Sequence, residues 1–477
     1  MTASSTQDKT ASPNSFLLRC SLVAALGGLL FGFDTVVISG AQNQLKELFQ
    51  LSGFTQGFMT ASALIGTVIG ALLAARPSDA LGRKRCLQWA GVLFFVSAAG
   101  CAFAWDFWSL IVFRVIGGLG IGGSTVICPL YLAEISPARW RGRLGAFFQF
   151  NIVLGILVAY LSNYLLGLVD FGAAEWRWKL GVEALPALLF WLLLRNIPES
   201  PRWLIMRGRA DEASHVFAET GVENPAAQVA TIQASLDEET GAKKISEPLF
   251  RRIHALPVFL AVSVAMFNQL DGINALLYYL SPIFGMAGFD KVSGDLQSVF
   301  IGATNLVFTM LGMAIIDRVG RKTLLLGGAI GTGLCLLGVA WIFTINQYQG
   351  ALVWLLVGYI ACHAFGQGAV IWVFISEVFP NQVRSKGQVL GSSTHWIMAA
   401  AISWLFPVFA KNAGEPGAGI PFYFFAAMMV LQVTVVLRWY PETKGVPLEE
   451  IQKRLSGKNK SLRDVACDAR VFILNRR

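Results

Sequence analysis

The first long apolar segment of the chain contains a carboxylate, Asp34, within GGLLFGFDTVVISG. A charged side chain near the centre of a bilayer costs about 2.5–3.5 kcal/mol on insertion scales, so it persists only with a partner or a function. Arg114, in a later apolar segment, is the partner that we expect. Ionised Asp34 would hold Arg114, and a proton on Asp34 would weaken the pair. The alternative is a static ion pair that joins two helices.

Two further titratable residues lie in apolar segments, Asp271 in QLDGIN and His395 in THW. Asp271 is a candidate for contact with a substrate or a proton, and the alternative is an outward, solvated position. His395 can donate and accept hydrogen bonds and can titrate near neutral pH. For His395 the alternative is a structural histidine whose hydrogen bonds are satisfied.

Other kinds of chemistry find no support in the sequence. There is no P-loop, which argues against transport driven by ATP. The four histidines have no metal-ligand spacing, and the seven scattered cysteines indicate neither a zinc site nor a disulfide framework. We therefore expect no metal, no cofactor and no enzymatic activity.

Long apolar segments must position these residues. The chain has 477 residues, of which 55% are hydrophobic and 14% are charged, whereas soluble domains have about 25% charged residues. Lipid must therefore cover much of the surface. A spanning helix needs about 20 mostly apolar residues, and about twelve segments meet this criterion. Their approximate bounds are 17–40, 57–75, 87–104, 107–133, 144–168, 180–196, 256–284, 297–316, 323–345, 351–379, 387–410 and 420–440.

The charges indicate the orientation in the membrane. The net charge is +9, and the positive charges gather in the even-numbered connections, such as 83–85 and 139–143. The positive-inside rule then predicts that both termini are cytoplasmic. Because the same rule accounts for the positive net charge, that charge does not indicate binding to nucleic acid. Arg177 and Lys179, in an odd-numbered connection, are the exception. The polar first fifteen residues do not have the pattern of a cleavable signal peptide.

Three motifs recur about 240 residues apart, which indicates two related halves. The repeats are DALGRKR at Asp79 and DRVGRK at Asp317, AEISPARWRGR around Glu134 and SEVFPNQVRSKG around Glu377, and PESPR at Pro198 and PETKG at Pro441. Duplicated halves with a site between them are typical of many transporters. We predict an all-α polytopic membrane protein whose two six-helix halves are pseudo-symmetric. The predicted divisions are a polar cytoplasmic tail (1–15), an N-terminal half (16–197), a cytoplasmic linker with short helices (198–253), a C-terminal half (254–440) and a basic cytoplasmic tail (441–477).

The set of motifs resembles the signatures of one family. GGLLFGFDTVVISG, RVIGGLGIGG, PESPR, NQLDGINALLYY and PETKG resemble those of the sugar porter family of the major facilitator superfamily, over nearly the whole chain after Phe16. Within this family, the chain resembles the bacterial proton-coupled xylose, galactose and arabinose symporters most. The resemblance implies a major facilitator fold and proton-coupled monosaccharide uptake by alternating access across the inner membrane. It also implies that Asp34, with Arg114, is the proton-coupling group.

The resemblance also implies a sugar site. Amide side chains can donate to and accept from sugar hydroxyls, and aromatic rings can pack on the apolar faces of a sugar. Asn268 and Asn274 lie about 240° apart on a straight helix, so they share a site only if the helix breaks, for which Gly272 is a plausible place. For the tryptophans the alternative is helix or lipid packing. The expected substrate-binding residues are Phe31, Ile156, Asn268, Gln269, Asn274, Tyr278, Asn305, Trp372, His395 and Trp396.

Some positions depart from the family pattern. Ile156 stands where the xylose symporter has glutamine, so a hydrogen bond is lost there, although galactose-type relatives also have isoleucine. Asn268 stands where relatives often have glutamine, and His395 stands where the xylose symporter has glutamine. Asp271 stands where an uncharged residue is usual.

The repeated cytoplasmic motifs suggest a gating network of ion pairs. We expect it to hold the cytoplasmic side closed in the outward-open state and to release it on inward opening. The alternative is that these charges are topology signals only. The expected members are Asp79 with Arg83, Glu134 with Arg141, Glu199 with Arg202, Asp317 with Arg321, and Glu377 with Arg384.

Several functional alternatives remain open at this point. They are a facilitative sugar uniporter, an antiporter of drugs or organic ions with the same fold, and a sugar sensor. Only about 35 residues follow Tyr440, and sensors usually have long cytoplasmic tails, which argues against a sensor. The expected partners are a monosaccharide, a proton and the lipid bilayer, and the expected oligomeric state is a monomer. The sequence does not identify the sugar.

Overall fold

The computed structural model describes residues 14–446 with gaps at 138, 170, 242–247 and 381–382. Within this part of the chain, eleven helices are long and apolar enough to cross a membrane. The sixth predicted segment is formed by α8 (Glu175–Gly181), α9 (Ala184–Leu193) and η3 (Leu194–Asn196), which together begin before the predicted residue 180. The predicted all-α polytopic fold is confirmed. Most of both predicted tails lies outside the described residues.

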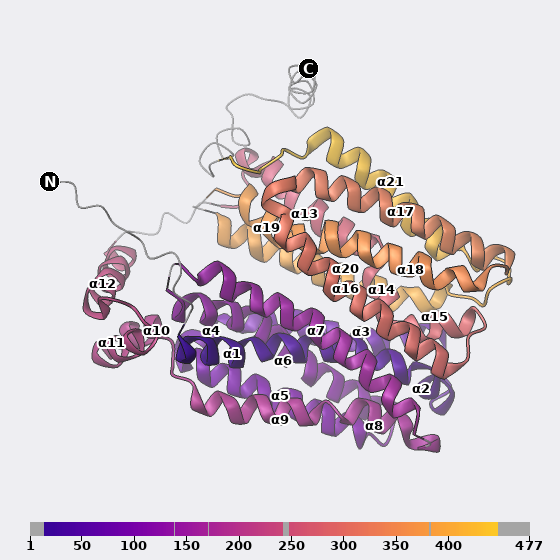
Figure 1. The fold of residues 1–477 in the computed structure, drawn as a ribbon, viewed down its shortest axis with the longest axis horizontal. Coiled ribbons are helices and arrows are strands. Elements are labelled where there is room, and N and C mark those ends of the chain that lie inside the picture. Colours follow the sequence, from indigo (N-terminus) through magenta and orange to yellow (C-terminus); the bar gives the residue numbers. More distant parts are fainter. Residues whose placement is uncertain (1–13, 138, 170, 242–247, 381–382, 447–477) are drawn as a thin grey trace.

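Two helical bundles, one from each half of the chain, lie side by side (Figure 1). The N-terminal bundle contains α1 (Ser15–Val37), α3 (Gly53–Leu73), α4 (Ala75–Leu81), α5 (Arg83–Ala102), α6 (Phe107–Ile135), α7 (Arg141–Gly167), α8 and α9. The C-terminal bundle contains α13 (Ala255–Leu270), α14 (Ile273–Tyr278), α16 (Lys291–Val319), α17 (Arg321–Ile345), α18 (Gln349–His363), α19 (Ala369–Val378), α20 (Arg384–Phe409) and α21 (Ile420–Trp439). The bundles meet along α3 and α20, along α7 and α16, and where η1 (Ile38–Ala41) and α2 (Gln42–Leu48) contact α15 (Leu280–Met286).

Side-chain caps define where several helices begin. Ser52 accepts a hydrogen bond from the N–H of Thr55 at the start of α3, and Asp290 caps α16 in the same way. Asp106 and Ser109 form a reciprocal capping box at the start of α6. These oxygens satisfy N–H groups that have no partner within the helix, so they stop the apolar segment at a defined residue.

Two irregular segments interrupt the helices of the C-terminal bundle. α13 and α14 are separated by Gly272, whose φ is +88°. A left-handed backbone suits glycine, and a Cβ at this position would lie 2.5 Å from a ring carbon of Phe425. The predicted break at Gly272 is therefore confirmed. The second irregularity is η5 (Ala364–Gly368), a π segment between α18 and α19, and such segments are frequent at functional sites.

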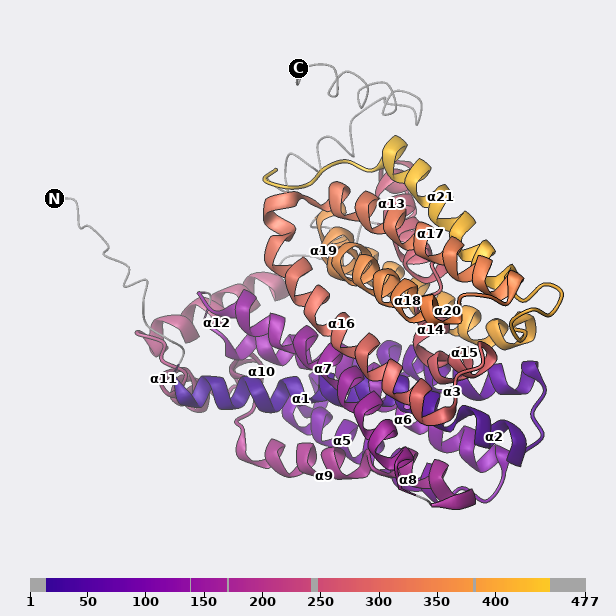
Figure 2. The same ribbon diagram turned by 45° about the vertical axis from the view of Figure 1, so that its right-hand side comes forward.

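The linker helices α10 (Pro201–Met206), α11 (Ala210–Glu219) and α12 (Pro225–Gly241) lie at one end of the N-terminal bundle (Figures 1 and 2). α11 is amphipathic, because its residues Ala213, Val216 and Phe217 are buried in the core of the N-terminal half. The turned view in Figure 2 also shows α16 beside α7, where the two halves contact.

Candidate functional site

A cavity lies between the two bundles, and both halves line it. The cavity has a volume of about 150 Å³. All ten residues that the sequence predicts for substrate binding line this cavity: Phe31, Ile156, Asn268, Gln269, Asn274, Tyr278, Asn305, Trp372, His395 and Trp396. Their contact with a sugar stays a prediction.

The sequence analysis missed four polar residues of the cavity, Thr35, Gln149, Thr309 and His363. Gln149 lies seven residues before Ile156, and Thr309 lies four residues after Asn305. Residues with these spacings share one face of a helix, so helical spacing was the signal that would have found them. No comparable pattern points to His363.

The amides of the cavity form a continuous chain of hydrogen bonds. Asn274 Nδ2 donates to Gln269 Oε1 over 2.7 Å, and Gln269 Nε2 donates to Asn268 Oδ1 over 2.9 Å. Gln269 Nε2 also lies 3.3 Å from Nδ1 of His395 on α20. The break at Gly272 thus lets both sides of the interrupted helix present one polar surface, which a straight helix could not do.

Aromatic rings form the other surface of the cavity. The ring of His395 lies between Trp372 and Trp396, with centroid distances of 4.9 Å and 4.8 Å. Phe31 of the N-terminal half makes an edge contact with Trp396, at a centroid distance of 5.6 Å. A small polar ligand with apolar faces would therefore meet amides on one side and rings on the other.

The predicted contact between Asp34 and Arg114 is confirmed. Oδ1 of Asp34 lies 2.5 Å from Nη1 of Arg114, and the two residues are only 3% and 1% exposed. Among the described residues, Oδ2 of Asp34 and two nitrogens of Arg114, Nε and Nη2, have no hydrogen-bond partner. A buried ion pair whose donors and acceptors are not all hydrogen-bonded is only partly compensated for the loss of water. A proton on Asp34 would therefore change the energy of the Asp34–Arg114 pair strongly.

Glu183, between α8 and α9, is a neighbour of this pair that the sequence analysis missed. It is 4% exposed and interacts electrostatically with Asp34 and Arg114. Its Oε1 has no hydrogen-bond partner within the described chain. The signal was present, because Glu183 is a carboxylate inside the predicted segment 180–196 and so needs a partner or a function by the same argument as Asp34.

Asp271 is fully buried, so the solvated alternative for this residue is wrong. Its Oδ2 lies 2.5 Å from Nδ1 of His363, which follows Asp271 by 92 residues in the chain. The pair lies directly behind the cavity, because His363 lines the cavity wall.

The cytoplasmic motif of the N-terminal half forms a compact network. Nε of Arg83 lies 2.9 Å from Oε2 of Glu134, and Nη1 of Arg83 lies 3.2 Å from Oδ1 of Asp79. Ser200 donates to Glu134 over 2.5 Å. Arg83 is the first residue of α5, so the network joins the start of this helix to the end of α6.

The C-terminal half repeats this network. Arg321, the first residue of α17, lies 2.9 Å from Glu377 and 2.9 Å from Asp317. Thr443 donates to Glu377 over 2.6 Å, as Ser200 does to Glu134. The sequence repeat is therefore also a repeat of ion-pair geometry. Its role in gating stays a prediction.

One of the expected pairings differs from the structure. Arg384 donates to the carbonyl oxygen of Phe379 over 3.4 Å, whereas Glu377 binds Arg321, so the pairing of Glu377 with Arg384 is wrong. Glu134 binds Arg83, and its expected pairing with Arg141 stays a prediction, because the side chain of Arg141 lies outside the described part. The reason is that Arg83 and Arg321 are buried at helix starts, where each faces a carboxylate.

Glu199 closes the turn before α5. Its Oε1 accepts hydrogen bonds from the N–H groups of Lys84 (3.0 Å) and Ser200 (2.8 Å). Gly82, with a φ of +96°, makes room for it, because a Cβ would lie 2.2 Å from Oε2 of Glu199. Burial raises the pKa of the Glu199 carboxyl above its ordinary value, although the N–H groups and Arg83 lower it.

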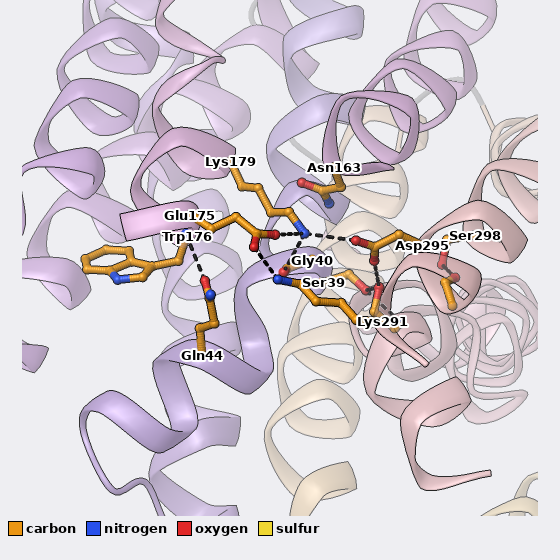
Figure 3. Close-up of polar contacts among 12 residues, drawn as sticks. Ser39, Gly40, Gln44, Asn163, Glu175, Trp176, Lys179, Lys291, Asp295 and Ser298 are labelled. Carbon is orange, nitrogen blue, oxygen red and sulfur yellow. Dashed lines mark hydrogen bonds and ion pairs between the residues drawn. The ribbon is translucent and has the colours of Figure 1, made fainter. Parts of the chain in front are cut away.

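A polar cluster ties the two halves together at the opposite end of the molecule (Figure 3). Nζ of Lys179 lies 2.8 Å from Oε1 of Glu175 and 2.9 Å from Oδ2 of Asp295, and Lys291 also pairs with Glu175. Lys179 is completely buried, and it also donates to the carbonyl oxygen of Gly40 over 3.1 Å. The sequence analysis did not propose this cluster. Its signal was the basic residues 177 and 179, which break the charge pattern of the odd-numbered connections.

The fold and the site define a class of protein. Two pseudo-symmetric bundles of membrane-spanning helices, with a polar and aromatic cavity between them, are the architecture of a membrane transporter. The family described as "Sugar (and other) transporter" matches residues 20–455. The chain belongs to this sugar transporter family of the major facilitator superfamily.

Relatives and solved structures agree with this assignment. The chain is 34% identical to the D-xylose-proton symporter of Escherichia coli (strain K12), over 92% of this chain and 96% of that protein. It is also 34% identical to the arabinose-proton symporter of Bacillus subtilis (strain 168), over 92% and 95%. The inward-open structure of the xylose transporter XylE from E. coli has a TM-score of 0.81 at 32% identity, covering 92% of this chain and 100% of that chain.

Proposed function

We propose that this protein carries a monosaccharide and a proton together across the cytoplasmic membrane by alternating access, with both termini in the cytoplasm. The observation that carries the proposal is the buried ion pair of Asp34 and Arg114, beside a cavity of amides and aromatic rings. The names of the xylose and arabinose relatives, both proton symporters, support the same function.

In this proposal the cavity binds the sugar. Gln269, Asn274 and Asn305 exchange hydrogen bonds with sugar hydroxyls, because an amide both donates and accepts. Trp372 and Trp396 pack against the apolar faces of the ring. Amides that are already linked to one another are held in position before the ligand binds, which reduces the entropy lost on binding.

The proton acts in the N-terminal half. A proton from outside binds Asp34 and weakens its attraction for Arg114, so the helices that carry them, α1 and α6, can move relative to each other. Thr35 is adjacent to Asp34 and lines the cavity, while Tyr278, another cavity residue, interacts electrostatically with Arg114. These residues connect the ion pair to the sugar site, so sugar occupancy and protonation can favour the same conformation.

The first test is uptake of radiolabelled xylose, arabinose, glucose and galactose into vesicles with and without an imposed inward proton gradient. We expect at least one sugar to accumulate above its outside concentration only when the gradient is present. Uptake that equilibrates and ignores the gradient would indicate a uniporter. Absence of uptake for every sugar in the panel would contradict the proposal and favour an antiporter or a sensor.

The second test is the substitution Asp34→Asn, which removes the titratable group and keeps its shape. We expect sugar counterflow to continue and gradient-driven accumulation to fall to the equilibrium level. Asp106→Asn is the matched control, because Asp106 is an exposed helix cap and asparagine caps equally well. Undiminished accumulation in Asp34→Asn would rule out the coupling role.

A further inference from the structure

The C-terminal half contains its own buried acid–base pair. Asp271 is fully buried, and its Oδ2 lies 2.5 Å from Nδ1 of His363 and 3.1 Å from Nε2 of Gln367. Its Oδ1 accepts a hydrogen bond from the N–H of Ile273 over 2.9 Å. The hydroxyl of Tyr359 donates to the Asp271 carbonyl oxygen over 3.1 Å. The carboxylate is therefore held in one geometry from several sides.

No lysine or arginine in the described part of the chain forms an ion pair with Asp271. Among the described residues, its single ion-pair partner is His363, which is a cation only when it is protonated. From α21 the neighbours of the cluster include the amide of Gln432, which accepts from Gln367 over 3.0 Å. The other titratable groups around the pair are Tyr359 and Cys362 on α18, Cys335 on α17, His395 on α20 and Tyr278 on α14.

The pair joins the two irregular segments of the C-terminal half. Asp271 directly precedes Gly272, where the α13–α14 segment breaks, and His363 directly precedes the π segment η5. His363 also lines the cavity, whereas Asp271 lies behind it. Nε2 of His363 is on the side of the ring near Gly368, another residue of the cavity wall.

We propose that Asp271 and His363 bind a second proton and that this proton strengthens sugar binding in the cavity. The inference rests on the proposed sugar transport and adds a proton site that is independent of Asp34. Without the proton, the buried pair of Asp271 and His363 has a net charge of one negative unit. When the proton is bound, the positive imidazolium of His363 offsets the negative carboxylate of Asp271. An uncompensated buried charge is strongly unfavourable.

The direction of the coupling follows from the position of the pair. A sugar in the cavity displaces water from the exposed edge of His363, which makes the uncompensated carboxylate of Asp271 less favourable. Bound sugar therefore favours the protonated pair, and by linkage the proton favours bound sugar. The proton resides on Nε2 of His363, while Nδ1–H continues to donate to Asp271. The protonated Nε2 can then donate to a sugar hydroxyl.

The test is sugar affinity as a function of pH in protein that already carries Asp34→Asn, measured on purified protein with the panel sugar that gives the highest uptake. Because one proton is linked to binding, we expect the affinity to weaken by up to about tenfold per pH unit above the range in which the pair holds its proton. The double substitution Asp271→Asn with His363→Gln should remove this dependence. It replaces both charged partners by amides that can still hydrogen-bond, so it avoids an unpaired buried charge.

His395→Gln, in the same Asp34→Asn protein, is the matched control, because His395 is also a buried histidine of the cavity wall. We expect it to change the affinity but to keep the pH dependence. The proposal is overturned if the Asp34→Asn protein binds sugar equally at all pH values, or if its pH dependence survives the double substitution. If wild-type uptake is driven by a proton gradient while the Asp34→Asn protein shows a flat profile, the second site fails and the proposed function stands.

Discussion

The two ends of the molecule use ion pairs in opposite ways. At one end, Lys179 of the N-terminal half binds Asp295 of the C-terminal half, and Lys291 of the C-terminal half binds Glu175 of the N-terminal half; we propose that this end faces outward. At the other end, which we propose to be cytoplasmic, the ion pairs of the repeated motifs that the structure describes, such as Arg83 with Glu134, join residues of the same half.

This difference identifies the state of the transporter. Pairs that cross between the halves must break before the outer side can open, whereas pairs within one half can persist while the halves move. The chain is thus closed at the end that contains Lys179. We expect the pairs around Lys179 to hold this state and the pairs of the repeated motifs to keep the helix ends of each half in place.

The largest effect should come from Lys179→Met, which removes the buried cation between two carboxylates. Breaking a buried pair costs about 3–5 kcal/mol. Opening of the outer side lets water solvate the carboxylates, so we expect this free energy to shift the protein towards the outward-open state. The measurement is the labelling rate of Ser39→Cys by a membrane-impermeant maleimide, in protein whose native cysteines are replaced, because Ser39 is buried beside Ser281 of the other half.

Lys179→Arg is the control for this substitution, since it keeps the positive charge, and its labelling rate should stay near that of the parent. Equal labelling of Lys179→Met and Lys179→Arg would show that the outer cluster does not hold the outer side closed.

A smaller effect is expected at the cytoplasmic end from Gly82→Ala and Gly320→Ala. Both glycines have positive φ, and a Cβ would lie 2.2 Å from Oε2 of Glu199 or 2.6 Å from Oε2 of Glu442. Backbone strain of this kind costs about 1–3 kcal/mol, and the glutamate cap must also move. We expect both variants to lose thermal stability to a similar extent, because the two halves repeat the same turn.

Gly208→Ala separates strain from contact in this comparison. Gly208 also has a positive φ, +73°, but nothing lies within 4 Å of its virtual Cβ. Its melting temperature should fall less than that of Gly82→Ala. An equal fall in melting temperature for the two variants would show that the clash with Glu199 does not contribute to the destabilisation of Gly82→Ala.

The smallest effect is expected for Arg209→Ala on the cytoplasmic linker. Arg209 and Glu212 form a 2.6 Å ion pair, but both side chains are about half exposed. Water and salt screen such pairs, so they contribute little. We expect no measurable change in melting temperature, uptake or labelling of Ser39→Cys. A clear shift in labelling would show that exposed pairs also bias the two states and would weaken the contrast between the two ends.

Much of the site could be predicted because intramembrane polar residues are conspicuous in an apolar sequence. Asp34 and Arg114 stand out by charge alone, and their 2.5 Å contact follows from the need of a buried charge for a counter-charge. Asn268 and Asn274 share the cavity because Gly272 breaks the helix, and the spacing of the two amides already required such a break. These predictions depend only on the spacing of nearby residues or on the pairing of two opposite charges, and the sequence contains both kinds of information.

Other features depended on which neighbours a residue meets. Glu134 has basic residues close by in its own motif, but it binds Arg83, 51 residues away. His363 carries no motif and becomes part of the site only because η5 brings it beside Asp271. Lys179 lies in a predicted connection between two spanning segments, where a lysine is usually exposed, yet it is completely buried against the opposite half.

The sequence by itself determined most of the membrane-spanning segments, the duplication of the motifs in the two halves and ten of the residues that line the cavity. The physical reason is that hydropathy, charge and helical spacing act along the chain. Only the tertiary structure decided which partners Glu134, Asp271 and Lys179 meet and which end of the molecule is closed. Those outcomes depend on contacts between segments that are 51 to 116 residues apart, from Glu134 with Arg83 to Lys179 with Asp295, and on the relative position of two halves that the sequence leaves free to move.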